Sequence, residues 1–418
     1  MKTLNYFGHS VATVFLLIFA FGIAAEPEPQ PKTSLEKQLG PDGEWPLMFD
    51  WHGSEFMGAS LMLSLNNAFF WSEDRLIDLT GITLSQPWAG ILRSVELVGL
   101  VLPVNDLAFL MQHEYFGHGA RAREFGLQTS WPKLESLPLP FGPGIASVSH
   151  APPHNIKESL VITLGGVEGA SVLAEEINTR WWRNKKMNAK TTFMNILATH
   201  NTDGYLWIFP PSKLSANLRA GHDMVAYVEK VNKMYGDQRL TLDYMTWSVA
   251  TNLINPFTYF SFYSMYRYIV HGERTNDYPY FSFGNFSFLP SMRYVLSPFG
   301  PEYHLLNYMT FGERNLKAYM RYGQLKTANY FGLGASGDIY SNWGITLGAR
   351  FHAWRQPEIN SNNFGRAKLG ASGSITLDYR PASFISLNGL LGYKSAGFVL
   401  GEPIDQSLIW RAGLTIHL

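Results

Sequence analysis

The chain of 418 residues contains no cysteine, and this absence excludes several classes of protein. Without thiols there is no disulfide scaffold, cysteine-based zinc module, iron–sulfur cluster or thiol nucleophile. Charged residues are also few, at 16%, and 33 basic side chains balance 33 acidic ones. Because nucleic-acid binding requires a clear basic excess, we expect no nucleic-acid partner. The sequence also lacks the GxSxG and P-loop motifs.

Hydrophobic residues make up 46% of the chain and aromatic residues 15%, which indicates a cell-envelope protein that contacts a membrane. Its first 25 residues combine Lys2, the apolar run Val11–Ile23 and the small pair Ala24-Ala25. This pattern predicts a secretory signal peptide over 1–25, since the apolar run is shorter than the roughly 20 residues that span a bilayer. Residues 26–47, rich in Pro, Glu, Gln and Lys, are expected to form an extended linker.

The last 140 residues alternate between apolar and polar or small side chains, as in Trp343, Ile345, Leu347, Ala349 and Phe351. This alternation is expected when one face of a sheet meets lipid and the other a polar lumen. It predicts an antiparallel transmembrane β-barrel over 278–418, with a soluble barrel or sandwich as the alternative. About eight strands are expected, at 288–296, 301–311, 314–324, 328–339, 343–355, 367–380, 384–395 and 407–418. The last of these resembles the sorting strand of outer-membrane barrels, although it ends in Leu418 and not in an aromatic residue.

Residues 48–277 show helical periodicity and are predicted to form a mainly helical domain, which makes the fold class α+β. The expected helices span 57–70, 88–125, 156–184, 190–199, 219–235 and 242–271. The most apolar stretch, Ile91–Met111, carries Arg93, Glu96 and Asp106. Each charge at a mid-helix position costs about 2.5–3.5 kcal/mol on membrane-insertion scales. We therefore expect these helices to pack together on the periplasmic side of the outer membrane.

One predicted helix carries His113-Glu114-Tyr115-Phe116-Gly117-His118. This segment resembles the HExxH motif of zincin metallopeptidases, which implies two zinc-binding imidazoles and a glutamate that activates water. The spacing here is one residue longer, and positions five apart lie about 140° apart on a regular helix. Either a π-bulge near Gly117 brings His113 and His118 together with Glu114 as the base, or Glu114 and His118 are ligands on a regular helix.

A catalytic zinc site normally has a third protein ligand. Glu168, within Gly165-Gly166-Val167-Glu168-Gly169, is the expected one, by analogy with zincins that use a downstream glutamate. Other candidates are Glu175, Glu176, His150, His154, His200 and His222. The simpler interpretation is a structural cluster of buried hydrogen bonds without a metal.

These features predict an outer-membrane-anchored zinc metallopeptidase that hydrolyses a peptide or protein substrate, with His113, His118 and Glu168 as metal ligands and Glu114 as the general base. The alternative is a non-enzymatic barrel, acting as a channel, receptor or assembly factor, with a structural histidine cluster. A third hypothesis places the chemistry in the barrel wall, as in lipid-A-modifying barrels. Its candidate residues are His352, Ser372 and Ser374.

Overall fold

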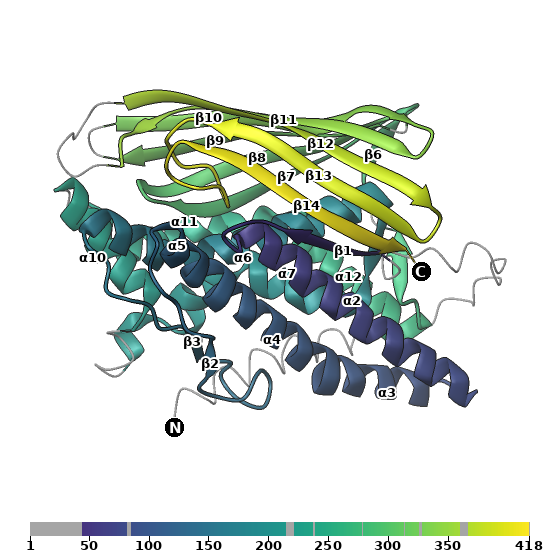
Figure 1. Ribbon diagram of the computed structural model, residues 1–418. Helices are drawn as coiled ribbons and strands as arrows, with labels where there is room; N and C mark the ends of the chain where they lie inside the picture. Colours follow the sequence, from purple (N-terminus) through teal and green to yellow (C-terminus); the bar gives the residue numbers. More distant parts are fainter. Residues whose placement is uncertain are drawn as a thin grey trace.

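The computed structural model describes residues 44–417, apart from 82–84, 215–220, 237–238, 278, 313, 326–327 and 360–366. The signal peptide predicted at 1–25 and residues 26–43 of the predicted linker lie outside the described residues. The fold has two layers, a group of helices and a single curved antiparallel sheet that covers one side of them (Figure 1). The predicted α+β class, with helices first and strands last, is confirmed.

The sheet has ten strands in the order β1-β14-β13-β12-β11-β10-β9-β8-β7-β6, all paired antiparallel. All eight predicted strands are present, each within a few residues of its predicted limits. The strands are β1 (Glu44–Phe49), β6 (Phe281–Phe283), β7 (Phe286–Ser297), β8 (Gly300–Phe311), β9 (Arg314–Leu325), β10 (Ala328–Asn342), β11 (Ile345–Pro357), β12 (Ala367–Ala382), β13 (Ile385–Lys394) and β14 (Ser407–His417).

The sheet is not closed into a barrel, which corrects the sequence-based prediction. Residues 44–47, predicted as linker, belong to β1, which pairs with β14 and forms one edge of the sheet. Helix α2 (Glu55–Thr80) packs along this edge, where Ser60 and Ser64 donate to the Pro46 carbonyl at 2.7 and 2.5 Å. Because these hydroxyls bind the backbone of the edge strand, a helix takes the place that a closing strand would occupy in a barrel.

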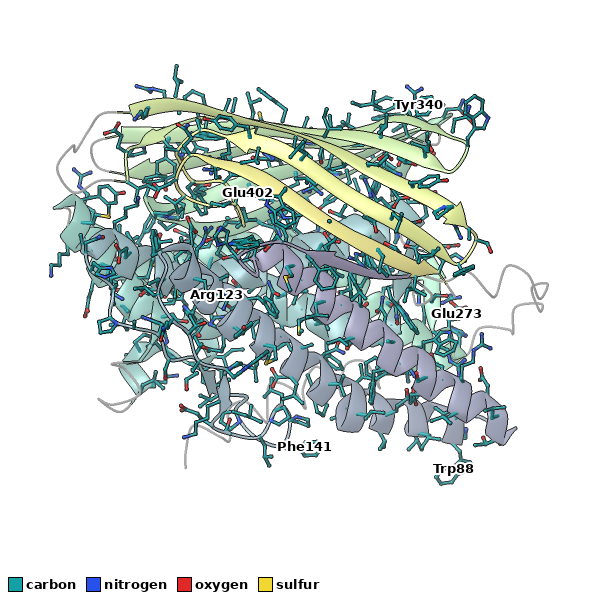
Figure 2. The ribbon with its side chains drawn as sticks, in the orientation of Figure 1. Trp88, Arg123, Phe141, Glu273, Tyr340 and Glu402 are labelled. Carbon is teal, nitrogen blue, oxygen red and sulfur yellow. The ribbon has the colours of Figure 1, made fainter. Side chains whose placement is uncertain are left out.

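The two faces of the sheet differ in the way that the alternation predicts. Polar side chains such as Arg321, Gln356 and Arg411 point toward the helices and are buried. Apolar side chains at the alternate positions are exposed, with Leu369, Ile375 and Leu391 at 78%, 63% and 61%, respectively. Figure 2 shows side chains filling the space between the two layers, where Glu402 lies, and side chains projecting from the outer face of the sheet. The sheet is therefore apolar on its outer face, whereas the face that packs against protein combines polar side chains with buried apolar ones such as Leu306 and Tyr308.

The helices lie within a few residues of the predicted segments, except that α2 extends ten residues beyond the predicted 57–70. Residues 219–220 of another predicted segment lie outside the described residues, and the segment predicted at 242–271 is divided before Pro256. The helices are α2, α3 (Trp88–Glu96), α4 (Leu102–His113), α5 (Gly119–Glu124), α6 (Ile156–Asn184), α7 (Thr192–Thr199), α8 (Asn201–Asp203), α10 (Asp223–Tyr235), α11 (Leu242–Ser248) and α12 (Pro256–His271). The π-helical turns η2 (Leu97–Val101), η3 (Glu114–His118) and η5 (Gly204–Ile208) and the 3₁₀ turns η4 (Ala189–Thr191), η6 (Pro211–Lys213) and η7 (Val249–Ile254) lie between or beside them. Three short strands, β2 (Lys133–Leu134), β3 (Ala146–Ser147) and β4 (Lys186–Asn188), lie among the helices, and β4 pairs with β5 (Thr275–Asp277).

Segments α3 to α5 form one continuous helix, Trp88–Glu124, which is long and apolar enough to cross a membrane, although half of its most apolar stretch is buried. Its charged residues have partners within the helical layer. Glu96 pairs with Lys190 at 2.7 Å, Asp106 accepts a hydrogen bond from the Leu139 amide at 2.9 Å, and Arg93 donates to the Ile269 carbonyl at 3.2 Å. These contacts place the charges against neighbouring helical turns and a loop, as expected for a packed helix.

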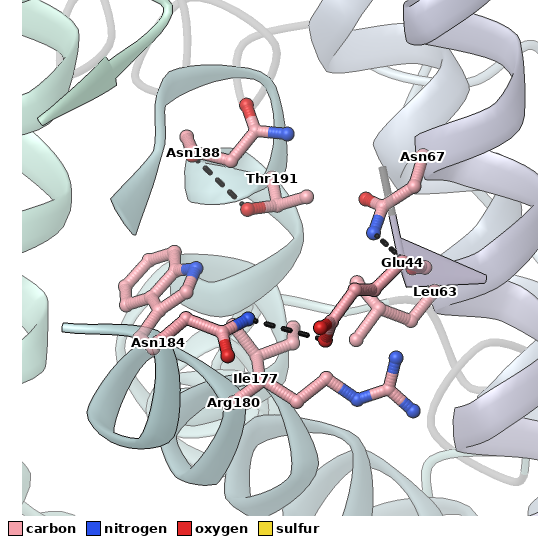
Figure 3. A pocket seen from close by; sticks show the side chains of 9 residues that line it. Glu44, Leu63, Asn67, Ile177, Arg180, Asn184, Asn188 and Thr191 are labelled. Carbon is pink, nitrogen blue, oxygen red and sulfur yellow. Dashed lines mark hydrogen bonds between the residues drawn. The ribbon is translucent and has the colours of Figure 1, made fainter. Parts of the chain in front are cut away.

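Helix α6 lies between the long helix and the sheet, and most of its residues are buried. Near its C-terminal end, a small polar cavity of about 20 Å³ lies between α6 and α2, lined by Glu44, Asn67 and Asn184 among others (Figure 3). The Asn184 amide donates to the Glu44 carboxylate at 3.4 Å across it. A cavity of this size holds about one water molecule, so it is a hydrated gap in the core.

Candidate metal centre

The π-helical turn η3 places both histidines of the motif on one side of the long helix. It spans Glu114–His118 and lies between α4 and α5, where the turn contains one residue more than a turn of regular α-helix. The imidazole rings of His113 and His118 have centroids 5.0 Å apart. One ligand atom from each of His113, Glu114 and His118 lies within 4.8 Å of the others. Of the two arrangements left open by the sequence, the structure has the bulged helix.

Glycines on α6 allow this helix to contact the π turn directly. A Cβ atom added to Gly117 would lie 2.6 Å from the Gly165 carbonyl oxygen. A Cβ atom added to Gly166 would lie 2.4 Å from Nε2 of His113 and 2.4 Å from Nε2 of His118. Both imidazole nitrogens therefore face a space that only glycine leaves open.

A third charged group in the centre is Asp223, the first residue of α10. Its Oδ2 atom lies 3.2 Å from Nε2 of His113 and 3.3 Å from Nε2 of His118. The Tyr205 hydroxyl, from η5, donates to the same oxygen at 2.9 Å and lies 3.3 Å from Nε2 of His113. Sequence reasoning missed both residues. The signal in the sequence was the dipeptide His222-Asp223, in which His222 was the predicted candidate ligand and Asp223 is the residue that reaches the cluster.

The outer nitrogen of His118 is held by the backbone, because Nδ1 lies 2.7 Å from the Ile162 carbonyl oxygen. A carbonyl can only accept, so Nδ1 carries the proton. In the neutral ring, Nε2 then has a free lone pair that faces Asp223. Metal-binding histidines are typically oriented by such a second hydrogen bond. His113 has no corresponding partner at Nδ1 among the described residues.

The electrostatics of this cluster favour positive charge next to Asp223. Burial alone lowers the pKa of His118, but the Asp223 carboxylate outweighs it and raises the pKa to about 9. Burial likewise raises the pKa of Asp223, but the two imidazoles lower it well below its ordinary value. Burial raises the pKa of Glu114, against the effect of His118 and His113. The side chains of His118 and Asp223 keep 12% and 17% exposure, so solvent reaches the cluster.

These donors fit a divalent cation of the zinc type. Tetrahedral zinc binds imidazole nitrogen at about 2.0–2.1 Å and carboxylate oxygen at about 2.0–2.2 Å, which separates neighbouring ligand atoms by about 3.3 Å. The distances of 3.2 and 3.3 Å from Asp223 to the two imidazoles agree with this separation. The absence of a side chain at Gly166 leaves room beside both nitrogens. His113, His118 and Asp223 could therefore hold the ion, with Glu114 beside them.

Glu168, the third ligand expected from the sequence, is not part of this cluster. It lies two residues beyond Gly166, or about 200° around the helix from the position that faces the imidazoles. Its carboxylate accepts from Arg121 Nε at 2.9 Å and from the Gly401 amide at 2.8 Å. Glu168 belongs to α6, Arg121 to the long helix and Gly401 to the loop before β14. The Glu168 carboxylate therefore connects these three segments.

The other candidate ligands also have partners elsewhere. Glu175 pairs with Arg293 and Lys317, Glu176 with Arg180, His154 with Glu158, and His200 with Asp203, while His150 lies near the Ala151 carbonyl and His222 near the Tyr205 and Phe209 carbonyls. On the sheet, His352 Nδ1 lies 2.7 Å from the Tyr319 hydroxyl, and His352 is the register partner of Ser372. None of these groups belongs to the group of His113, Glu114 and His118 that could hold a metal ion.

Comparison with known proteins finds no family that matches this chain, and no curated protein or solved structure that is significantly similar to it.

Proposed function

We propose that this protein is a zinc-dependent metallopeptidase held at the outer membrane of a Gram-negative cell. The observation that carries the proposal is the convergence of His113 Nε2, His118 Nε2 and Asp223 Oδ2 at 3.2 and 3.3 Å, with the Glu114 carboxylate next to them. Two imidazoles, a carboxylate ligand and a free carboxylate are the set that hydrolytic zinc sites use.

When bound, zinc supplies a Lewis acid that acidifies water and polarises a peptide carbonyl. Glu114 lies next to both imidazoles, and with Asp223 as the carboxylate ligand its own carboxylate serves as the general base. It takes a proton from the attacking water and delivers this proton to the leaving amine. Burial raises the pKa of the Glu114 carboxyl, which makes it a better proton acceptor and donor near neutral pH.

Tyr205 is a positioning residue in this scheme. Burial, with Asp223 and Glu114 adding to it, raises the pKa of the Tyr205 hydroxyl well above its ordinary value, so the group remains a hydrogen-bond donor. Its hydrogen bond of 2.9 Å to Asp223 Oδ2 fixes the carboxylate between the two imidazoles. A ligand set held in this way needs little reorganisation when the ion binds.

The outer face of the sheet supports the membrane location. Exposed apolar side chains there form continuous rows across neighbouring strands, such as Ile375 beside Leu391 and Leu391 beside Trp410. Soluble monomers rarely expose apolar patches larger than a few hundred Å². Lipid contact removes this surface from water, and the inner face of the sheet packs on the helices, which we place on the periplasmic side.

The proposal is tested with the purified protein, a fluorescent casein substrate and a mixed peptide library. We expect one zinc per chain and hydrolysis that falls at least 100-fold in Glu114→Gln, with zinc content unchanged. The matched control is Glu229→Gln, which removes an exposed carboxylate from α10 and leaves turnover intact. Absence of stoichiometric zinc, or full activity of Glu114→Gln, contradicts the mechanism. One zinc per chain without any turnover favours the non-enzymatic alternative.

A further inference from the structure

An apolar groove of about 540 Å³ runs along one edge of the sheet, far along the chain from the metal centre. Its walls come from β7, from the start of α12 and from the segment that leads into β6, with Pro290, Phe260 and Tyr280 among the lining residues. Most of its lining is apolar. Sites that bind small ligands typically have volumes of about 300–1,000 Å³.

The groove exists because β7 is only partly paired on this edge. Strand β6 pairs with Phe286–Phe288 alone, and β7 continues to Ser297. Pro290 has no N–H to offer to another strand, which keeps a further strand from adding there. Instead α12 faces this part of β7, and the Ser291 hydroxyl lies 3.1 Å from the Asn255 amide oxygen at the helix cap. The partial pairing of β7 therefore leaves the groove open between this strand and α12.

The groove opens onto the outer apolar face of the sheet. Leu305 lines the groove and is 41% exposed. By strand register it belongs to a row that runs from Met292 through Leu305 and Met320 to Leu333. An apolar molecule that covers the outer face can therefore continue into the groove without crossing a polar boundary.

A positive charge lies next to one of the residues that line the groove. The Lys185 Nζ atom is 4.9 Å from the ring of Tyr280, which lines the groove, and 3.3 Å from the ring of Trp182. It donates to the Thr310 hydroxyl at 2.7 Å. Burial lowers the pKa of Lys185 to about 8, and within the described part of the chain no carboxylate opposes this effect. Among the described residues Lys185 therefore has no acidic partner, and its ammonium group lies next to a ring that lines the groove.

We propose that this groove binds one acyl chain of an anionic membrane lipid, with the lipid head group next to Lys185. The apolar wall accepts the hydrocarbon, whose transfer from water is favourable. The ammonium group of Lys185 complements the negative head group. This site is independent of the metal centre and of the proposed hydrolysis.

The test uses the full chain and the fluorescent fatty acid cis-parinaric acid, with its uncharged methyl ester for comparison. We expect one acid bound per chain, and displacement of the probe by phosphatidylglycerol. Lys185→Gln should weaken binding of the acid about tenfold and leave binding of the ester unchanged. Leu305→Glu, which places a charge in the groove wall, should abolish binding of both.

The matched control is Leu391→Glu, because Leu391 is exposed on the same face but lies outside the groove. It should bind the probe as the unaltered protein does. The circular dichroism spectrum and the midpoint of thermal unfolding of each variant report that the fold is intact. Equal losses in Leu305→Glu and Leu391→Glu, an acid affinity that does not depend on Lys185, or a probe that phosphatidylglycerol does not displace would each overturn the proposal.

Discussion

Replacing Gly166 with alanine tests whether the proposed metal site depends on the space between α6 and the two imidazoles. This space exists because residue 166 has no side chain. In the structure the added Cβ atom lies 2.4 Å from Nε2 of both His113 and His118, about 1 Å closer than ordinary contact. The three closest atoms belong to side chains and not to backbone, so the rings move and the helices stay. A displacement of this size takes both nitrogens out of coordination distance. We expect zinc affinity to fall at least 100-fold, which is about 2.7 kcal/mol.

The assay is competition for zinc with a chromogenic chelator, combined with thermal unfolding in the presence and absence of zinc. Gly99→Ala is the control, since Gly99 also lies in a helical segment and has nothing within 4 Å of an added Cβ. Because alanine is about 1 kcal/mol better than glycine in a helix, Gly99→Ala should be neutral or slightly stabilising. If Gly166→Ala behaves like Gly99→Ala and binds zinc normally, our interpretation of the site is wrong.

Three further predictions concern residues with different roles. Glu168→Gln should leave one zinc per chain but lower the free energy of unfolding by about 3 kcal/mol, measured in urea, because it breaks a buried pair with Arg121; loss of zinc would instead make Glu168 a ligand. Tyr205→Phe should retain zinc and lower kcat about tenfold with KM unchanged, since it removes one hydrogen bond of about 1–1.5 kcal/mol to Asp223; an unchanged kcat would remove Tyr205 from the site. Burial raises the pKa of Asp106 to about 6, so its contribution to stability is present below pH 4 and is lost as pH rises through 6, by about 3 kcal/mol. Asp106→Asn should lose this part of the pH dependence of unfolding, and identical pH profiles for the two proteins would refute it.

Local patterns in the sequence were sufficient for eight of the ten strands of the sheet and for the histidine motif. The two-residue alternation predicted eight strands and which of their faces is apolar, because neighbouring side chains of a strand point to opposite sides whatever the tertiary fold. The spacing of His113 and His118 offered two arrangements, and the bulged one, with Gly117 inside the π turn, is the one formed.

Only the tertiary structure decided how the sheet ends and which carboxylate meets the histidines. An open sheet whose edge is bound by Ser60 and Ser64 of α2 follows from packing between distant segments, and alternation within a strand carries no information about it. Asp223 lies more than 100 residues from His113 and reaches it because α10 begins beside the long helix. From its position among the glycines, Glu168 was as good a candidate ligand as Asp223. The orientation of α6 about its own axis, however, points the Glu168 side chain toward Arg121. Side-chain type and spacing therefore determined which residues could bind a metal, whereas helix packing selected the ones that meet.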